Sequence, residues 1–133
     1  MNTNSENLKV ICAEDCGNAP KKSLLKELTV AYARHDFDFC ATWFSDHVVW
    51  DIIGEKRISG KVEFLEELKK RSNTQVEELT IDNIITHGNV ASVNGTYLFH
   101  NGETLAFCDV YQFAGFGKKA KIKAVTSYFI QIK

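Results

Sequence analysis

Two aspartates stand in strand-like segments with apolar neighbours, and they are the side chains best suited to acid–base chemistry. Asp51 lies in the Val-, Ile- and Trp-rich segment 47–53, and Asp109 lies between Phe107 and Tyr111 on one face of another strand. Aspartate is disfavoured in strands, and a carboxylate on an apolar face must be hydrogen-bonded, paired or shifted in its pKa. If both carboxylates enter one dry cavity, one can act as a base and the other as a neutral acid.

A simpler interpretation stays open for each aspartate, namely a solvent-facing or sheet-edge side chain bonded to a lysine or a backbone amide. The aromatic residues around them suit either a solid core or the wall of a pocket for a flat apolar ligand. Val49 and Ile53 share the face of Asp51 because strand side chains alternate. We therefore expect a ligand to contact Trp43, Val49, Ile53, Phe107 and Tyr111.

The cysteines and histidines predict no metal site. Cys12 and Cys16 have a C-x3-C spacing, but no second close Cys/His pair follows, and a structural zinc site needs four ligands. His35, His87 and His100 fall at element ends or beside a turn, where solvated side chains are expected.

The first six residues are polar and lack the basic and apolar regions of a signal peptide. This pattern predicts a cytoplasmic protein, in which Cys12, Cys16, Cys40 and Cys108 are reduced thiols.

The overall charge and hydropathy exclude two classes of partner. Sixteen Lys and Arg against 17 Asp and Glu give a net charge of −1, without the basic excess typical of nucleic-acid-binding proteins. The apolar stretches are far shorter than the roughly 20 residues that span a bilayer. We expect neither nucleic acid nor membrane as a partner.

The order of the predicted elements indicates an α+β fold. Residues 1–17 form an N-terminal arm, and residues 18–133 form a single domain. Helices are predicted to start at Asn18-Ala19-Pro20, after a cap at Asp36, and at Ser59-Gly60, with a strand at 47–53 between the last two. A run of strands follows at 77–87, 90–100, 103–114 and 120–132, with Asn101-Gly102 as a strong hairpin signal.

Both faces of the strand at 103–114 carry apolar residues, so both need a cover. The helices cover one face. A second copy of the chain, packed sheet to sheet, is the economical cover for the other, so we expect a homodimer.

The chain resembles the NTF2-like superfamily, and within it the SnoaL-like branch. The resemblance is carried by residues 32–36, 44–54, 60–61, 101–103 and 108–113. It implies a cone in which three N-terminal helices pack on a curved, mostly antiparallel sheet that encloses a pocket.

The resemblance also implies roles for particular residues. Ketosteroid isomerase, a member of this superfamily, places its base in a D-x-x-x-x-D-x-x-G stretch, which residues 46–54 match with Asp51 at the base position. Its protonated aspartic acid lies in a D-V-x-x-F stretch, which assigns that role to Asp109. The family's helix-one tyrosine falls near Leu28, and Tyr32 lies one turn later on the same helical face. SnoaL-like cyclases use one pocket aspartate as acid and base.

These observations lead to a functional hypothesis with two alternatives. The leading one is a small enzyme of the isomerase, cyclase or dehydratase type that moves a proton beside a carbonyl of a small apolar ligand without a cofactor. Asp51 is its expected base, and Asp109 and Tyr32 are expected to stabilise the enolate oxygen. The alternatives are a non-catalytic module that binds or senses a small ligand, and a protein-interaction domain.

Overall fold

Seven strands form one mixed sheet in the computed structural model, which describes residues 8–12 and 19–132. The strands are β1 (Lys9–Cys12), β2 (Phe44–Ile52), β3 (Lys56–Ser59), β4 (Val76–His87), β5 (Val90–Phe99), β6 (Thr104–Phe113) and β7 (Ile122–Ile132). Their order across the sheet is β1-β4-β5-β6-β7-β2-β3. β1 is parallel to β4 and β2 is parallel to β7, whereas all other neighbouring strands are antiparallel.

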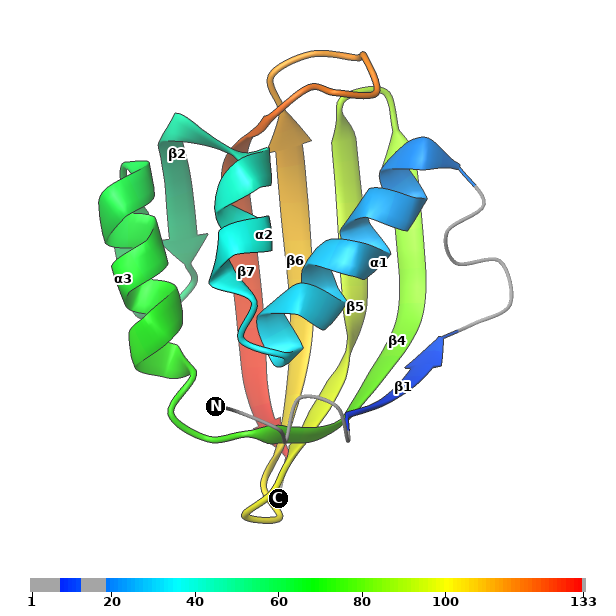
Figure 1. Ribbon diagram of the computed structural model, residues 1–133, viewed down its shortest axis with the longest axis vertical. Coiled ribbons are helices and arrows are strands. Elements are labelled where there is room, and N and C mark those ends of the chain that lie inside the picture. Colours follow the sequence, from blue (N-terminus) through cyan, green and yellow to red (C-terminus); the bar gives the residue numbers. More distant parts are fainter. Residues whose placement is uncertain (1–7, 13–18, 133) are drawn as a thin grey trace.

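Three helices cover one face of this sheet (Figure 1). They are α1 (Pro20–Ala33), α2 (Phe37–Trp43) and α3 (Lys61–Arg71). α2 begins where the sequence predicts, because the Asp36 side chain accepts a hydrogen bond of 3.2 Å from the backbone N–H of Phe39. The expected set of three N-terminal helices is corrected to two, since α3 follows the β2–β3 hairpin.

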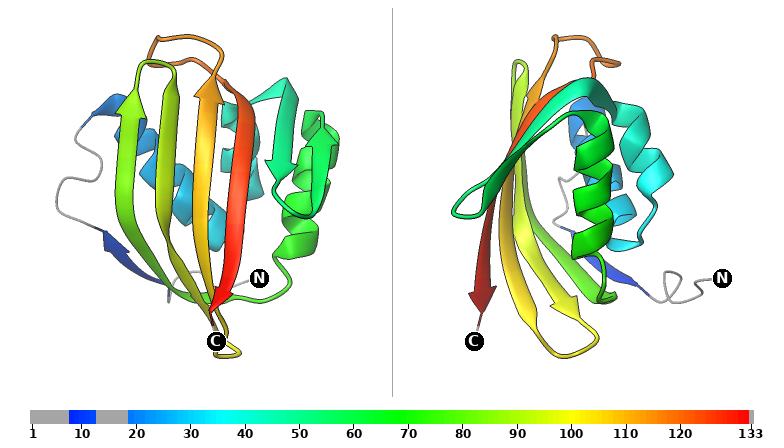
Figure 2. Two further views of the ribbon diagram at one scale, coloured as in Figure 1. Left: turned by 180° about the vertical axis from the view of Figure 1, so that it is seen from behind. Right: turned by 90° about the vertical axis from the view of Figure 1, so that its left-hand side faces the viewer.

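The four strands β4 to β7 form the long antiparallel meander that the hydrophobic alternation predicts. Each observed strand begins and ends within about two residues of its predicted bounds. Gly88 and Gly102 occupy the two tight turns with φ of +61° and +89°, a conformation that other residues adopt at a steric cost. The strands bend together, so that the sheet curves around the helices (Figure 2).

Two strands of the sheet were not predicted. Residues 9–12 of the expected N-terminal arm form the edge strand β1, with Lys9 in register with Glu78 of β4. Gly54, at φ +81°, reverses the chain so that β3 pairs with β2. Residues 1–7 and 13–17 of the expected arm lie outside the described residues, whereas Leu8 is described and buried.

The expectation of four reduced thiols is wrong for Cys12, which is disulfide-bonded. Cys40 and Cys108 are free, and Cys16 lies outside the described residues.

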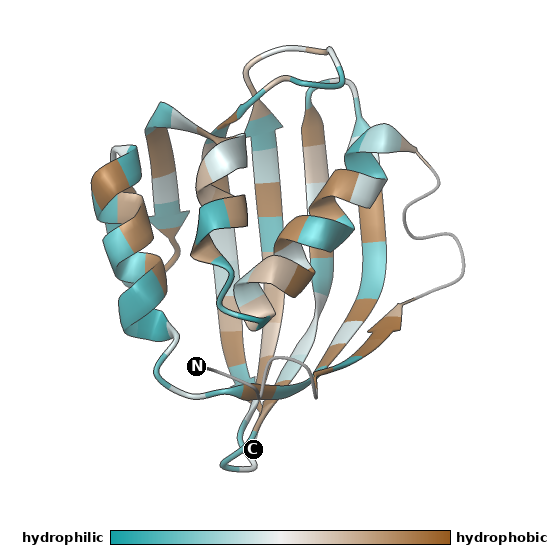
Figure 3. Ribbon diagram, viewed as in Figure 1, coloured by the Kyte–Doolittle hydropathy of each residue, from teal (hydrophilic) through white to brown (hydrophobic). Residues whose placement is uncertain are grey.

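The core lies between the helices and the inner face of the sheet. Leu25 and Leu28 of α1 and Phe64 of α3 are buried against it. Hydrophobic and hydrophilic residues alternate along the strands, as expected for a sheet with one covered face (Figure 3). Among the described residues, none of the helices has the length and apolar character that crossing a membrane requires.

Candidate functional site

A cavity of about 50 Å³ lies between the helices and the inner face of the sheet. α1 contributes Leu28 and Tyr32 to its wall, and the strands contribute Trp50, Tyr97 and Asp109. Aromatic rings make up much of the lining. Asp109 is the one acidic side chain among the described residues that line the cavity.

The sheet register places Asp109 beside a serine and a tryptophan. Asp109 of β6 is the cross-strand partner of Ser127 in β7, and Trp50 of the adjacent β2 lies on the same inner face. Trp50 Nε1 donates a hydrogen bond of 2.8 Å to Ser127 Oγ, which in turn donates one of 2.6 Å to Asp109 Oδ1. Trp50 and Ser127 are both buried. The carboxyl group is therefore held in a fixed orientation.

The surroundings of Asp109 raise the pKa of its carboxyl group toward the physiological range. Part of the Asp109 side chain is accessible from the cavity. Protein atoms surround the rest of it closely, so burial is the largest influence on its pKa. Burial raises the pKa of this carboxyl from 3.8 to about 6, although the hydrogen bond from Ser127 acts in the opposite direction. The group is mostly ionised at pH 7 and can accept a proton within the physiological range.

Three tyrosines surround the same cavity and remain neutral. Burial raises the pKa of Tyr32 to about 12 and the pKa values of Tyr97 and Tyr111 well above 10, and the negative charge of Asp109 adds to each shift. Within the part of the chain that the structure describes, the hydroxyls of Tyr97 and Tyr111 make no hydrogen bond. Neither hydroxyl oxygen is a fully buried atom that lacks a partner. Both hydroxyls can therefore donate to a ligand.

Arg71 places a positive charge beside the rings at one side of the cavity. Its guanidinium carbon lies 5.8 Å from the ring centroid of Trp50 and 5.7 Å from that of Phe129. Arg71 Nε donates a hydrogen bond of 3.0 Å to Glu67, and a second nitrogen donates to Glu55. These bonds fix the guanidinium over the two aromatic walls.

The expectation that Asp51 shares this cavity with Asp109 is wrong. Trp50 faces the cavity, and because successive side chains of a strand point to opposite faces, Asp51 lies on the outer face. It stands there in register with Arg57 of β3. Val49 and Ile53, the expected ligand contacts beside Asp51, are likewise absent from the described lining, and Ile53 is exposed.

The other expected site residues divide between the wall and its surroundings. Tyr32, Asp109 and Tyr111 line the cavity. Phe107 is buried behind it and stacks on Tyr97 with ring centroids 4.5 Å apart. Trp43 lies outside the lining, with Lys121 Nζ 5.6 Å from its ring centroid.

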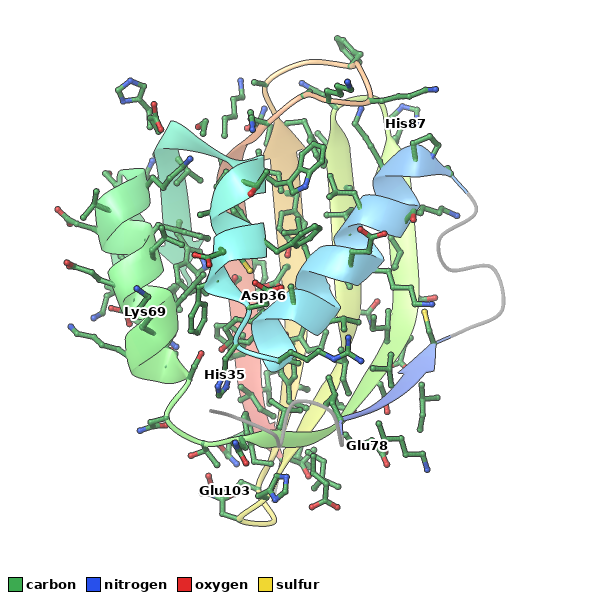
Figure 4. The ribbon with its side chains drawn as sticks, viewed as in Figure 1. His35, Asp36, Lys69, Glu78, His87 and Glu103 are labelled. Atoms are coloured by element: carbon green, nitrogen blue, oxygen red, sulfur yellow. The ribbon has the colours of Figure 1, made fainter. Side chains whose placement is uncertain are left out.

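Several residues of the wall were not expected from the sequence, and Tyr97, Ser127 and Phe129 are among them. A serine between Val125 and Phe129 on the inner face breaks an apolar alternation, and this signal was available in the sequence. The histidines stay away from the site. Figure 4 shows His35 at the turn between α1 and α2 and His87 at the end of β4.

Residues that could hold a metal ion do not cluster in the described ranges, where no three His, Cys, Asp or Glu side chains come together. Cys40 lines the cavity, and burial raises the pKa of its thiol to about 12. It is therefore a neutral thiol at physiological pH, and a poor metal ligand or nucleophile.

Comparisons with known proteins identify the superfamily. No protein-family model and no curated protein matches the chain. An NTF2-like protein of unknown function from Cytophaga hutchinsonii, by contrast, has a similar structure with a TM-score of 0.61 and 26% identity, over 81% of this chain and 97% of that one. The chain belongs to the NTF2-like superfamily.

Other NTF2-like structures share the fold at lower identity. A proposed ketosteroid isomerase from Kribbella flavida superposes with a TM-score of 0.68 at 14% identity, over 86% of this chain and 80% of that one. A proposed SnoaL-like polyketide cyclase from Shewanella denitrificans also reaches 0.68, at 11% identity over 83% and 90%. At these identities the likeness concerns the NTF2-like fold alone, because one fold hosts many functions.

Proposed function

We propose that this NTF2-like protein is a small acid–base enzyme of the SnoaL-like type, which moves a proton beside a carbonyl group of a small, largely apolar ligand without a cofactor. One observation supports the proposal above all. A single carboxylate with a pKa of about 6 shares an aromatic cavity with tyrosine hydroxyls that are free to donate. A base and neutral oxygen donors in one largely apolar site are what enolisation requires.

In the proposed reaction, ionised Asp109 removes a proton from the carbon next to the carbonyl. The electron pair of that C–H bond forms a carbon–carbon double bond, and the carbonyl π pair moves onto the oxygen to give an enolate. The hydroxyls of Tyr97 and Tyr111 donate hydrogen bonds to this oxygen. Asp109, now neutral, returns its proton to the same or a conjugated carbon, which gives exchange or isomerisation.

The placement of Asp51 moves the base to Asp109. With Asp51 on the outer face, the site resembles the one-carboxylate arrangement expected for SnoaL-like cyclases rather than the two-carboxylate arrangement of ketosteroid isomerase. The structural likeness to the proposed SnoaL-like cyclase is compatible with this assignment. The cavity of about 50 Å³ is also far smaller than pockets for drug-sized ligands, which measure roughly 300–1,000 Å³. This favours a ligand smaller than a steroid.

Deuterium exchange tests the proposal directly. The protein is incubated in D₂O with small cyclic ketones and aryl methyl ketones, and loss of the α-proton signals is followed by ¹H NMR. We expect exchange of at least one ketone faster than in buffer, and that Asp109→Asn abolishes the acceleration. If the ketones bind but exchange no faster than in buffer, the non-catalytic binding module replaces the enzyme.

A further inference from the structure

We infer that Ser127 and Trp50 are positioning residues that make Oδ2 the proton-transferring oxygen of Asp109. The inference assigns no new reaction and rests on the proposed role of Asp109. The hydrogen bond that sets this orientation can be tested without any substrate.

The direction of each hydrogen bond follows from the chemistry of its donors. An indole Nε1–H can only donate, so Ser127 Oγ must accept the 2.8 Å bond from Trp50. Among the described residues, Asp109 Oδ1 is the one acceptor for the serine's own proton, at 2.6 Å. The proton of the Ser127 hydroxyl therefore points at Oδ1, and a second proton on Oδ1 would be repelled by it.

Neither end of this chain of bonds is free to turn. Ser127 is 1% exposed and is fixed by the β6–β7 register, which sets it directly opposite Asp109. Trp50 is 4% exposed, and its ring packs against Phe64 with centroids 5.0 Å apart. The arrangement is preorganised before any ligand enters.

Oδ2 is the oxygen left for chemistry. Within the described ranges Oδ2 has no hydrogen-bond partner, and it is not fully buried. When Asp109 is ionised, Oδ2 is the oxygen free to take the ligand's proton. When Asp109 is neutral, the proton stays on Oδ2 because Oδ1 is already engaged.

Asp109 can be titrated without interference from its neighbours. The other titratable or charged groups that line or border the cavity are Tyr32 of α1, Cys40 of α2, Arg71 of α3, Tyr97 of β5 and Tyr111 of β6. Each thiol or phenol among them stays neutral, and Arg71 stays charged, between pH 4 and 9.

The experiment follows the ¹³C signal of the Asp109 carboxyl against pH by NMR, in the wild-type protein and three variants. Ser127→Ala removes the donor to Oδ1, so we expect the midpoint to rise by about one pH unit. Ser127→Thr keeps a hydroxyl and should return the midpoint toward the wild-type value. Trp50→Phe removes the donor that orients the Ser127 hydroxyl, and it should raise the midpoint by less than Ser127→Ala.

Two results would overturn the inference: a Ser127→Ala midpoint equal to that of the wild type, or a Ser127→Thr midpoint equal to that of Ser127→Ala. Dispersed amide spectra identify the variants that fold, and a folded Trp50→Phe variant with the wild-type midpoint would remove Trp50 from the inference. The outcome is separate from the proposed function. If the wild-type protein exchanges no ketone, the proposed reaction is wrong, but the titration midpoints can still be interpreted. If the protein exchanges ketones and the midpoints are unchanged in the variants, only the positioning role is wrong.

Discussion

Trp50 and Asp51 are consecutive residues of β2 whose side chains lie on opposite faces of the sheet. The indole of Trp50 lines the cavity and donates to Ser127, whereas Asp51 stands outside it, in register with Arg57. A shift of one residue along this strand would exchange the two. The number of carboxylates in the cavity therefore depends on the register of β2 against β7.

The two aspartates are expected to respond differently to the same substitution. Asp109→Asn removes the proposed base and should slow ketone exchange by about 10²- to 10⁴-fold. Asp51→Asn is the matched control and should leave the exchange rate within about twofold of the wild type, since its side chain lies outside the cavity. Exchange rates from ¹H NMR in D₂O measure both. A loss with Asp51→Asn and none with Asp109→Asn would contradict the assignment.

Stability should depend on pH through Asp109. Folding raises the pKa of this carboxyl from 3.8 to about 6, so the folded protein binds the proton more tightly than the unfolded chain does. The stability that protonated Asp109 contributes is fully present below pH 4. About 3 kcal/mol of the free energy of unfolding is lost as the pH rises from 4 through 6. Asp109→Asn lacks this loss. Between pH 4 and 7, the free energy of unfolding of Asp109→Asn, measured in urea, should therefore rise relative to that of the wild type. If the difference between the two proteins stays constant over this range, the pKa of Asp109 is not raised.

Removing a tyrosine hydroxyl from the cavity should lower activity without unfolding the protein. Tyr97→Phe and Tyr111→Phe each delete one donor to the proposed enolate oxygen and should reduce exchange by about 10- to 100-fold. Tyr128→Phe is the control, because Tyr128 lies outside the described lining of the cavity. Equal rates in all three variants would mean that the two cavity hydroxyls do not contact the reacting oxygen.

Gly95 should tolerate no side chain. It lies in β5 opposite Ile81 of β4, and a Cβ there would stand 1.9 Å from the backbone oxygen of Thr80. Gly95→Ala must therefore push two strands apart, and we expect a loss of about 2–3 kcal/mol in the free energy of unfolding. Gly117→Ala, which meets no atom within 4 Å, is the matched control and should be nearly neutral. Similar urea midpoints for the two variants would show that the strands move apart at little cost.

The outer face of the sheet is the surface that we propose for a homodimer. It exposes Ile130 at 64%, together with Tyr128 and Ile132 of the same strand. Monomers rarely leave such a contiguous apolar patch open. Light scattering should give twice the chain mass for the wild type and a shift toward monomer for Ile130→Glu. Val62→Glu on α3, where Val62 is 73% exposed, should stay dimeric. A monomeric wild type would end the proposal.

Local patterns in the sequence predicted most of the fold. The alternation over residues 77–132 and the turns at Gly88 and Gly102 gave four strands within about two residues of those observed. The cap at Asp36 marked the start of α2. β1 was missed because a short edge strand such as Lys9–Cys12 carries too few residues to show a period, and its partner β4 is more than 60 residues away.

The candidate site was only partly predictable. Asp109, Tyr32 and Tyr111 came from the sequence, because a polar group on an apolar strand face and a tyrosine on a helical stripe are local signals. Alternation showed that Trp50 and Asp51 face opposite sides, but not which side is covered. Ser127 and Tyr97 were missed because their role comes from neighbours on other elements, namely Asp109 of β6 and Tyr32 of α1.

What the sequence alone determined is therefore the order of the elements, the residues that share a face within each strand, and the presence of a carboxylate among apolar neighbours. These properties follow from interactions between residues close along the chain. The tertiary structure decided that β2 joins the sheet beside β7 with Trp50 inward, which hydrogen-bonds to Ser127 and leaves Asp109 as the only described carboxylate in the cavity. That choice depends on pairing between strands more than 70 residues apart, for which no local pattern carries the information.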